Sequence, residues 1–426
     1  MVDNINQGGN KWSQKKSNLN SKRGAKRPIQ TQPKTVLPQN SAPKDFAKTF
    51  DIIKKNEPKN IPVKITGKSS LNIGQMIMVG FRGTSQKNAG VRAVMKELAE
   101  GSIGGVMLMK HNVVSIAQIR RLTTALRRAA RSGGQPPPFI SVDQEGGQVQ
   151  RLRFTRFPSA ARIARASARN AAATYGRMAC ELHSAGINVN FGPVVDLNVF
   201  GKSNPIIGRL GRSYSKNPDV VVKYASQFVA AHKKYGIMTA AKHFPGHGSS
   251  LKDSHKGFTA IPRWNQTELI PFRKLAVKEA GQAVDLVMVG HLYNKIWGAP
   301  ASLSHKAITG ILRNKVGFRG LAITDDMEMG AIRRNYKWSQ AIRMAVNAGN
   351  DILLYSNTAG YDPYLGRKIR NVIARSICSP GQNNQPGCIP ARVIKVASQR
   401  IYFAKTDGLR RKKFNQKRRC SRVAKQ

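Results

Sequence analysis

From about Leu71 onward, short runs of apolar residues alternate with longer stretches whose apolar residues recur at helical spacing. Eight apolar runs have the length of strands: Met76–Phe81, Val106–Met109, Phe139–Val142, Val189–Leu197, Ile237–Ala241, Leu286–Val289, Leu321–Ile323 and Ile352–Tyr355. The helical stretches between them are Ala89–Glu100, Ile116–Arg131, Ala164–Ser184, Pro218–Tyr235, Gln266–Ala280, Ser304–Lys315 and Trp338–Ala348. Strands that alternate with helices predict a parallel sheet covered by helices.

Eight strand–helix units favour a closed barrel over an open sheet. The expected fold class is therefore α/β, with a single (β/α)8 barrel of the TIM type. An open, doubly wound sheet is the alternative, because the number of strands is difficult to fix from one sequence. The expected boundaries are a basic arm at residues 1–60, a barrel domain at residues 61–405 and a basic tail at residues 406–426.

The arm is rich in Asn, Gln, Lys, Ser and Pro and lacks an apolar period, so we expect it to be disordered, and the tail with it. The sequence contains neither the apolar core of a signal peptide nor a run of roughly 18 uncharged apolar residues. We therefore expect no membrane span and a cytoplasmic location. A periplasmic or secreted location is the alternative if the N-terminus is processed.

The chain is strongly basic, with 72 Lys and Arg against 21 Asp and Glu and a net charge of +51. Clusters such as Arg410–Lys413 and Lys417–Arg419 indicate that the termini contact a polyanion, either nucleic acid or an anionic wall polymer, through counterion release. A merely solvated tail is the alternative. Because carboxylates are scarce, each one beside a Gly- or His-rich motif is a candidate for chemistry.

The four cysteines show no CxxC spacing that would indicate a metal site. Cys378 and Cys388 flank a loop of Pro, Gly and Asn, so a bridge between them is conceivable in an oxidising compartment. Unpaired thiols are the alternative. Cys180 lies in a helical stretch and Cys420 in the basic tail.

A barrel places its active site in the loops at the carboxyl ends of its strands. The polar residues expected at those ends are Arg82, Lys110, His111, Asp143, Gln144, Glu145, Asp196, Lys242, His243, His291, Asp325, Asp326, Ser356 and Asn357. The helical stretches carry mainly Arg, Lys and Ala instead. We therefore expect the chemistry at this rim.

The segment Ala241–His255 leaves a strand and enters a loop that is dense in Gly, Ser and Pro. Its three His and one Asp could form a metal site, but HExxH is absent and the Pro-Gly breaks prevent a rigid helical face of ligands. In the other interpretation, Asp253 orients the imidazole of His255 and raises its basicity, as a proton shuttle requires. A solvated histidine with Asp253 as a loop cap is the structural alternative.

The strand that ends in Asp325 and Asp326 carries paired acids to the same rim. A carboxylate at a strand end can attack an electrophilic carbon in glycosyl transfer, while a second group donates the proton. Such a pair can equally cap a helix and occupy its first turn. We assign Asp325 to the site and Asp326 to local hydrogen bonding.

Several blocks resemble the motifs of family 3 glycoside hydrolases in their β-N-acetylglucosaminidase (β-hexosaminidase) branch. The blocks, in chain order, are Val142–Arg151, Arg212–Tyr214, the signature Lys242–Gly248 followed by Asp253–His255, and Ile323–Asp326. The resemblance runs from about Leu71 to Ala404. Separated motifs in one order are more specific than any single motif.

The resemblance implies a barrel enzyme that retains anomeric configuration and needs no metal, and we expect no cofactor. Asp325 matches the catalytic nucleophile, and His255 assisted by Asp253 matches the acid/base dyad on a mobile loop. The positions that match binding of the terminal N-acetylglucosamine are Asp143, Arg151, Arg212, Lys242 and His243. Ser249 departs from the pattern, because an acidic residue often follows Gly-His-Gly.

The resulting expectation is a monomeric, retaining exo-β-N-acetylglucosaminidase that hydrolyses a carbohydrate substrate, with muropeptides from peptidoglycan turnover as the family's usual substrate. A β-glucosidase or a glycoside phosphorylase of the same family is the alternative among enzymes. A basic polyanion-binding protein on a barrel scaffold is the alternative from another class.

Overall fold

A computed structural model describes residues 71–276, 283–379, 387–408 and Cys420, which all fall in one unit of the chain. The predicted arm at residues 1–60 and most of the predicted tail lie outside the described residues, as does the polyanion contact expected of them. None of the described helices is both long and apolar enough to cross a membrane.

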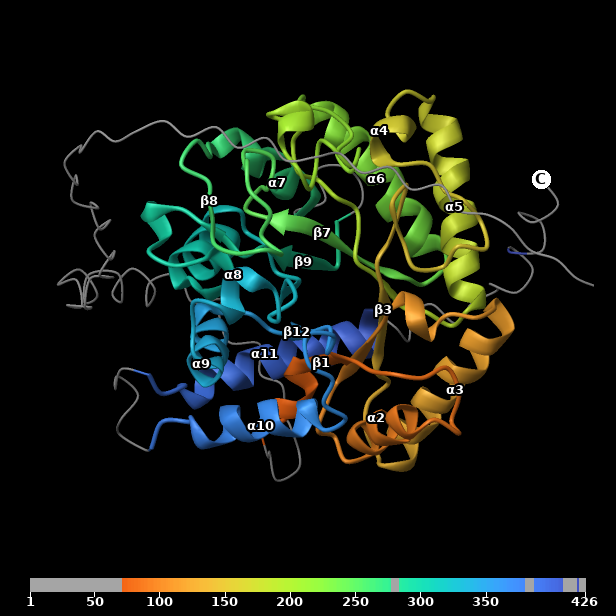
Figure 1. Cartoon of the computed structure of the whole chain (residues 1–426), viewed down its shortest axis with the longest axis vertical. Helices are drawn as coiled ribbons and strands as arrows, with labels where there is room; N and C mark the ends of the chain where they lie inside the picture. Colours follow the sequence, from red (N-terminus) through yellow and green to blue (C-terminus); the bar gives the residue numbers. More distant parts are fainter. Residues whose placement is uncertain (1–70, 277–282, 380–386, 409–419, 421–426) are drawn as a thin grey trace, which may run out of the picture. The chain divides into compact units, whose positions relative to one another are not determined.

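Eight parallel strands form the centre of the fold (Figure 1). They are β1 (Ile77–Gly80), β2 (Gly105–Leu108), β3 (Phe139–Val142), β6 (Val189–Asn190), β7 (Met238–Phe244), β9 (Leu286–Val289), β11 (Leu321–Thr324) and β12 (Leu353–Tyr355). Neighbours in the sheet follow one another in the chain, and a parallel bridge between Ile323 and Ile352 joins its two ends. This order confirms the expected (β/α)8 barrel, because a doubly wound sheet would reverse its strand order.

Helices surround the barrel in Figure 1. They are α2 (Ala89–Ala99), α3 (Ile116–Ser132), α4 (Ala160–Ile163), α5 (Ala168–Ser184), α6 (Pro218–Lys234), α7 (Ile270–Ala276), α8 (Gly330–Arg333), α9 (Trp338–Ala348), α10 (Leu365–Arg375) and α11 (Ala391–Phe403), with a π-helix at Lys306–Lys315. In α3, Ile119, Leu122 and Leu126 face the core, and Ser115 caps the helix by accepting from Gln118. Amphipathic periodicity therefore decides which face each helix buries.

Two expected elements differ in extent from the structure. Within the run Val189–Leu197, β6 ends at Asn190, and pairing with β7 resumes as a bridge between Val194 and Lys242; Pro193 between them has no N–H to donate. The helix expected to begin at Ala164 begins at Ala168, where Ser167 accepts a hydrogen bond from the backbone N–H of Asn170. Side-chain caps and proline thus set the boundaries that periodicity leaves open.

Lys405 closes the amino-terminal end of the barrel. Its buried ammonium donates to Gln75 Oε1 at 2.6 Å and to the carbonyl of Gly104 at 2.7 Å, and lies 4.6 Å from the centre of the Phe139 ring. Burial lowers the pKa of Lys405 to about 7. The last residue of the predicted barrel domain is therefore part of the core.

All four cysteines are paired, as Cys378–Cys388 and Cys180–Cys420. The first bridge joins the two ends of the α10–α11 connection, next to the parallel bridge between Ile377 and Ile389. The bridge considered for Cys378 and Cys388 is therefore present, and the alternative with two unpaired thiols is wrong. The second pair spans 240 residues, a separation at which the sequence offers no signal.

Candidate active site

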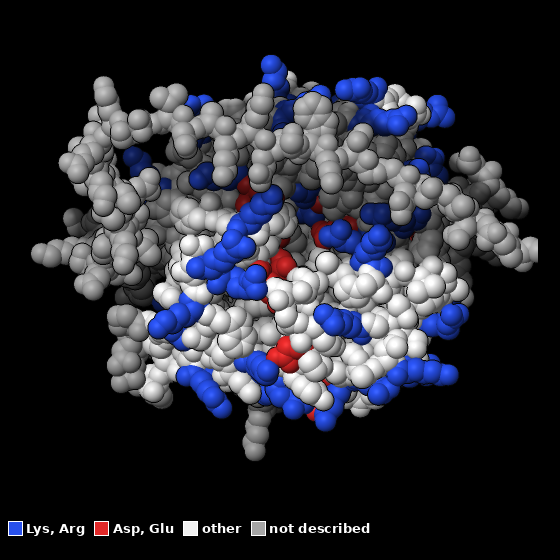
Figure 2. All heavy atoms as spheres, viewed as in Figure 1, with Lys and Arg blue, Asp and Glu red and all other residues white. Residues whose placement is uncertain are grey.

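The polar residues expected at the carboxyl ends of the strands meet at one rim of the barrel. Asp143 follows β3, Lys242 and His243 lie at the end of β7, and Asp325 follows β11 directly. Asp143, Lys242 and His243 are buried, and Asp325 is partly buried. Figure 2 shows that the few acidic side chains visible on this face lie along its middle and that Lys and Arg side chains surround them.

Asp143 binds two cations. Its Oδ1 accepts from Lys242 Nζ at 2.8 Å, and its Oδ2 accepts from Arg151 Nη2 at 3.0 Å. Burial raises the pKa of Asp143, but Lys242 and Arg151 outweigh it and the pKa is lowered. The group is therefore an ionised acceptor held between two donors, an arrangement suited to hydroxyl groups of a sugar.

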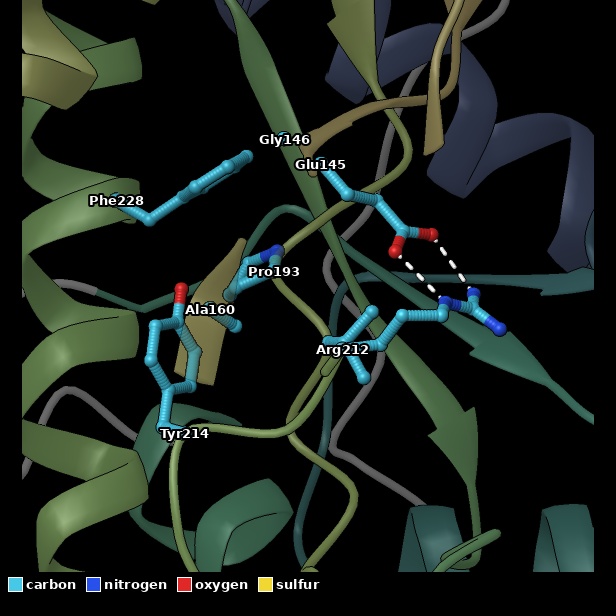
Figure 3. A pocket seen from close by; sticks show the side chains of 8 residues that line it. Glu145, Gly146, Ala160, Pro193, Arg212, Tyr214 and Phe228 are labelled. Atoms are coloured by element: carbon cyan, nitrogen blue, oxygen red, sulfur yellow. Dashed lines mark hydrogen bonds and ion pairs between the residues drawn. The ribbon is translucent and has the colours of Figure 1, made fainter. Parts of the chain in front are cut away.

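Glu145 forms a bidentate pair with Arg212, with both nitrogen–oxygen distances at 2.8 Å, and also accepts from Lys242 Nζ at 2.7 Å. Although burial raises the pKa of Glu145, Arg212 and Lys242 lower it to about 2. In Figure 3 the carboxylate and the guanidinium face each other beside a small pocket. The pocket is lined by Glu145, Gly146, Ala160, Pro193, Val194, Arg212, Tyr214 and Phe228.

Asp196 fixes the orientation of His243. Its Oδ2 accepts from His243 Nδ1 at 2.7 Å, and its Oδ1 accepts from the backbone N–H groups of His243 and His247. Burial raises the pKa of Asp196, but His243 outweighs burial, and the pKa of Asp196 is lowered. Because Nδ1 carries the proton, Nε2 of His243 can accept from Arg212 Nη2 at 3.2 Å.

The sequence interpretation placed Glu145 and Asp196 at the rim but gave neither a role. The structure connects Glu145 to Arg212 and Lys242, and Asp196 to His243, so two buried carboxylates hold three of the expected binding residues. The only signal in the sequence was their position directly after apolar runs in a chain with few acids.

Asp325 is partly buried, and its backbone N–H donates to the carbonyl of Val289 at 2.9 Å. Burial raises its pKa, but the nearby His243, His291 and His255 outweigh burial, so the pKa is lowered. Asp325 is thus a carboxylate at neutral pH. This is the form in which an acid can act as a nucleophile.

Asp326 has a different environment. Its Oδ1 accepts from the backbone N–H groups of Ser356 at 2.9 Å and Glu328 at 3.1 Å, and burial raises its pKa to about 6. His291 contacts the carbonyl of Asp326 through Nε2 and Ser302 Oγ through Nδ1. The side chain of Asp326 therefore connects the loops that follow β11 and β12.

Asp253 and His255 are paired on the loop that follows β7. Asp253 Oδ1 accepts from both Nδ1 and the backbone N–H of His255, each at 2.9 Å. The imidazole is 59% exposed, and no described residue hydrogen-bonds to its Nε2. His255 lowers the pKa of Asp325, so the exposed imidazole lies within electrostatic reach of this partly buried carboxylate.

The three histidines of the segment Ala241–His255 bind separate partners. His243 contacts Asp196 and Arg212, His247 Nε2 contacts Ser254 Oγ at 3.1 Å, and His255 contacts Asp253. Across the described part of the chain, no group of three or more His, Cys, Asp or Glu could hold a metal ion.

Ser249 stands where an acidic residue often follows Gly-His-Gly, and a buried carboxylate lies beside it. The backbone N–H of Ser249 donates to Glu268 Oε2 at 3.2 Å. Burial raises the pKa of Glu268 to about 7. An acid from the helical turn Gln266–Leu269 thus supports this loop from behind.

The chain is similar in sequence to known beta-hexosaminidases. Beta-hexosaminidase A of Pseudoalteromonas piscicida is 36% identical over 326 residues, which are 67% of this chain and 53% of that protein, so this chain spans about half of that relative. Beta-hexosaminidase of Alkalilimnicola ehrlichii is 35% identical over 66% of this chain and 80% of its own length.

Solved structures show the same fold. A glycoside hydrolase family 3 beta-N-acetylglucosaminidase from Paenibacillus sp. has a TM-score of 0.72 at 27% identity, covering 84% of this chain and 68% of its own. Beta-N-acetylhexosaminidase from Beutenbergia cavernae has a TM-score of 0.69 at 25% identity, covering 79% and 99%. The model of the glycosyl hydrolase family 3 N-terminal domain matches residues 70–375. The chain therefore belongs to family 3 of the glycoside hydrolases.

Proposed function

We propose that the protein is a retaining exo-β-N-acetylglucosaminidase. The observation that carries this proposal is the partly buried, ionised Asp325 at the end of β11, with the exposed His255, paired to Asp253, within its electrostatic reach. One group can attack the anomeric carbon while the other protonates the leaving oxygen. The names of the relatives support N-acetylhexosamine as the sugar.

In the first step, Asp325 attacks the anomeric carbon, and the bond between that carbon and the aglycone oxygen breaks. The departing oxygen takes a proton from His255 Nε2. In the second step, His255 removes a proton from water, which attacks the same carbon and releases Asp325. Two displacements restore the original configuration. Asp253 stabilises the imidazolium and holds its Nδ1 proton.

The terminal sugar binds, in this proposal, to Asp143, Arg151, Arg212, Lys242 and His243. Glu145 and Asp196 act behind them, because each holds the donor side chains by short ionic contacts. The family resemblance supports peptidoglycan fragments as the source of this sugar.

Aryl β-N-acetylglucosaminide and aryl β-glucoside, each with and without inorganic phosphate, test the proposal. We expect fast release of free β-N-acetylglucosamine from the first substrate, detected by NMR before mutarotation, and little turnover of the second. Formation of sugar 1-phosphate would instead identify a phosphorylase. An α-anomer as first product would exclude the retaining mechanism.

We also propose that the protein folds in an oxidising compartment, in contrast to the cytoplasmic location expected from the sequence. Pairing of all four cysteines supports this, because disulfides are rare in reducing compartments. Alkylation of thiols in intact cells followed by peptide mapping tests it. Labelling of Cys378 and Cys388 before reduction would contradict the proposal.

A further inference from the structure

The loop that carries His255 is fastened through its backbone to the start of α8. The carbonyl of His255 accepts from the N–H of Gly330 at 3.1 Å, and the carbonyl of Ser254 accepts from Ala331 at 3.3 Å. No side chain caps α8, so these carbonyls satisfy N–H groups that its first turn would otherwise leave unpaired. The loop is thus held by the connection that begins with Asp325.

Gly330 allows this approach because it has no side chain. A Cβ at this position would lie 2.7 Å from the carbonyl oxygen of His255 and 2.9 Å from the carbonyl carbon and oxygen of Lys256. Backbone atoms cannot rotate away as the end of a side chain can. Gly330 is not among the glycines with positive φ, so the contact and not the backbone conformation requires glycine here.

We propose that Gly330 is a positioning residue for the proton donor, an inference that rests on the proposed function. Its missing side chain lets the loop, which the family resemblance describes as mobile, dock directly on α8, and the docked arrangement sets the position of His255 relative to Asp325. Glycoside hydrolysis requires a defined separation between the two groups. A displacement of about 1 Å can lower the rate by about 100-fold.

Gly330→Ala tests the proposal, and Gly257→Ala is the matched control. Gly257 lies in the same loop, and a Cβ there would meet nothing within 4 Å. Ala favours a helix more than Gly does, so the test substitution does not weaken α8 itself. We expect Gly330→Ala to lower kcat on an unactivated N-acetylglucosamine disaccharide by about 10- to 100-fold. The second substrate is 2,4-dinitrophenyl β-N-acetylglucosaminide, whose leaving group needs little protonation. Its release of 2,4-dinitrophenol in a single turnover should change far less.

Limited digestion with trypsin supplies a readout that does not depend on activity. Lys252 and Lys256 are exposed on either side of His255, and we expect faster cleavage there in Gly330→Ala but not in Gly257→Ala. Equal rate losses on both substrates, or unchanged digestion of the loop, would overturn the inference. A wild-type protein that cleaves neither substrate would refute the proposed function, and the digestion rates would still decide whether Gly330 holds the loop.

Discussion

The two carboxylates that follow β11 differ in their protonation and their contacts. Asp325 has a lowered pKa next to three histidines, whereas burial raises the pKa of Asp326 to about 6 and two backbone N–H groups bind it. Neighbouring residues can thus have different tasks. One is available for covalent chemistry, and the other joins two loops.

Asp325→Asn should lower kcat by about 10⁴-fold or more while the fold is retained, because the amide cannot form the covalent intermediate. Asp326→Asn should lower kcat much less. A mechanism-based fluorosugar followed by peptide mass mapping identifies the nucleophile directly. Label on a residue other than Asp325 would refute the assignment.

His255→Ala should lower the rate by about 10²- to 10⁴-fold on substrates with poor leaving groups, because departure of such groups requires a proton. Cleavage of an activated aryl bond should be affected far less. Asp253→Ala should show the same pattern in a milder form, since the imidazole remains. A plot of rate against leaving-group pKa measures the difference, and parallel lines for mutant and wild type would show that His255 is structural.

The elements of the rim are connected by buried ion pairs. Glu145, which follows β3, joins Arg212 from the loop after β6 to Lys242 at the end of β7. Such a pair stabilises little by itself, but removing one partner leaves a buried charge without compensation. These contacts therefore fix how the loops are arranged.

Glu145→Gln should raise KM for the N-acetylglucosaminide and lower the free energy of unfolding by about 3 kcal/mol, because two buried cations lose their shared anion. Urea unfolding and steady-state kinetics measure the two effects. Gln144→Leu gives the comparison, because the hydrogen bonds described for the Gln144 side chain go to the backbone of Arg151 and Leu152 and not to the binding cations. An unchanged KM in Glu145→Gln would show that the pair does not position the binding residues.

The Cys378–Cys388 bridge joins the ends of the α10–α11 connection, and neither cysteine is among the proposed binding or catalytic residues. Replacing both cysteines by Ser should lower the free energy of unfolding by about 2–3 kcal/mol, as expected for a loop of this length. Turnover should be unchanged. Urea unfolding measures the change in stability, and steady-state kinetics measures turnover. A loss of turnover would contradict the prediction that the bridge does not affect the active site.

Lys405 should make the stability of the whole barrel depend on pH. Burial lowers its pKa from 10.5 to about 7 in the folded state, so the folded protein disfavours the charged form. The contribution of Lys405 to stability is therefore fully present above its unfolded-state pKa of 10.5, and it is lost as the pH falls toward its folded-state pKa of about 7. The free energy of unfolding should rise between pH 7 and 9 by an amount on the order of 1–3 kcal/mol.

The Lys405→Met variant has no titrating group at this position. Between pH 7 and 9, its free energy of unfolding should therefore change less than that of the wild type. Urea unfolding at pH 7 and 9 measures it. Stopping at pH 9 avoids ionisation of tyrosines in the unfolded chain, which would lower stability because burial raises the folded-state pKa of residues such as Tyr175. Equal pH dependence in both proteins would show that Lys405 is charged in the folded state.

Local information in the sequence determined the alternation of strands and helices and the residues that follow each strand. Both depend on periodicity and on the topology of a parallel barrel, which brings all carboxyl ends to one rim. The Asp253–His255 pair was also predictable, because its members are two residues apart and need only a turn. The first residues of the helices and the last residue of β6 were less predictable, since such boundaries depend on single residues such as the Ser167 cap of α5.

Tertiary structure alone decided the contacts between distant residues. Glu145 meets Arg212 across 67 positions, and Lys405 reaches Gly104 across 301. Gly330 meets the loop of His255 only because closure of the barrel places β7 and β11 on either side of β9. A periodic pattern records which face of an element is buried and not what lies against it, so the partners that hold the charges and the proton donor become visible only in the folded chain.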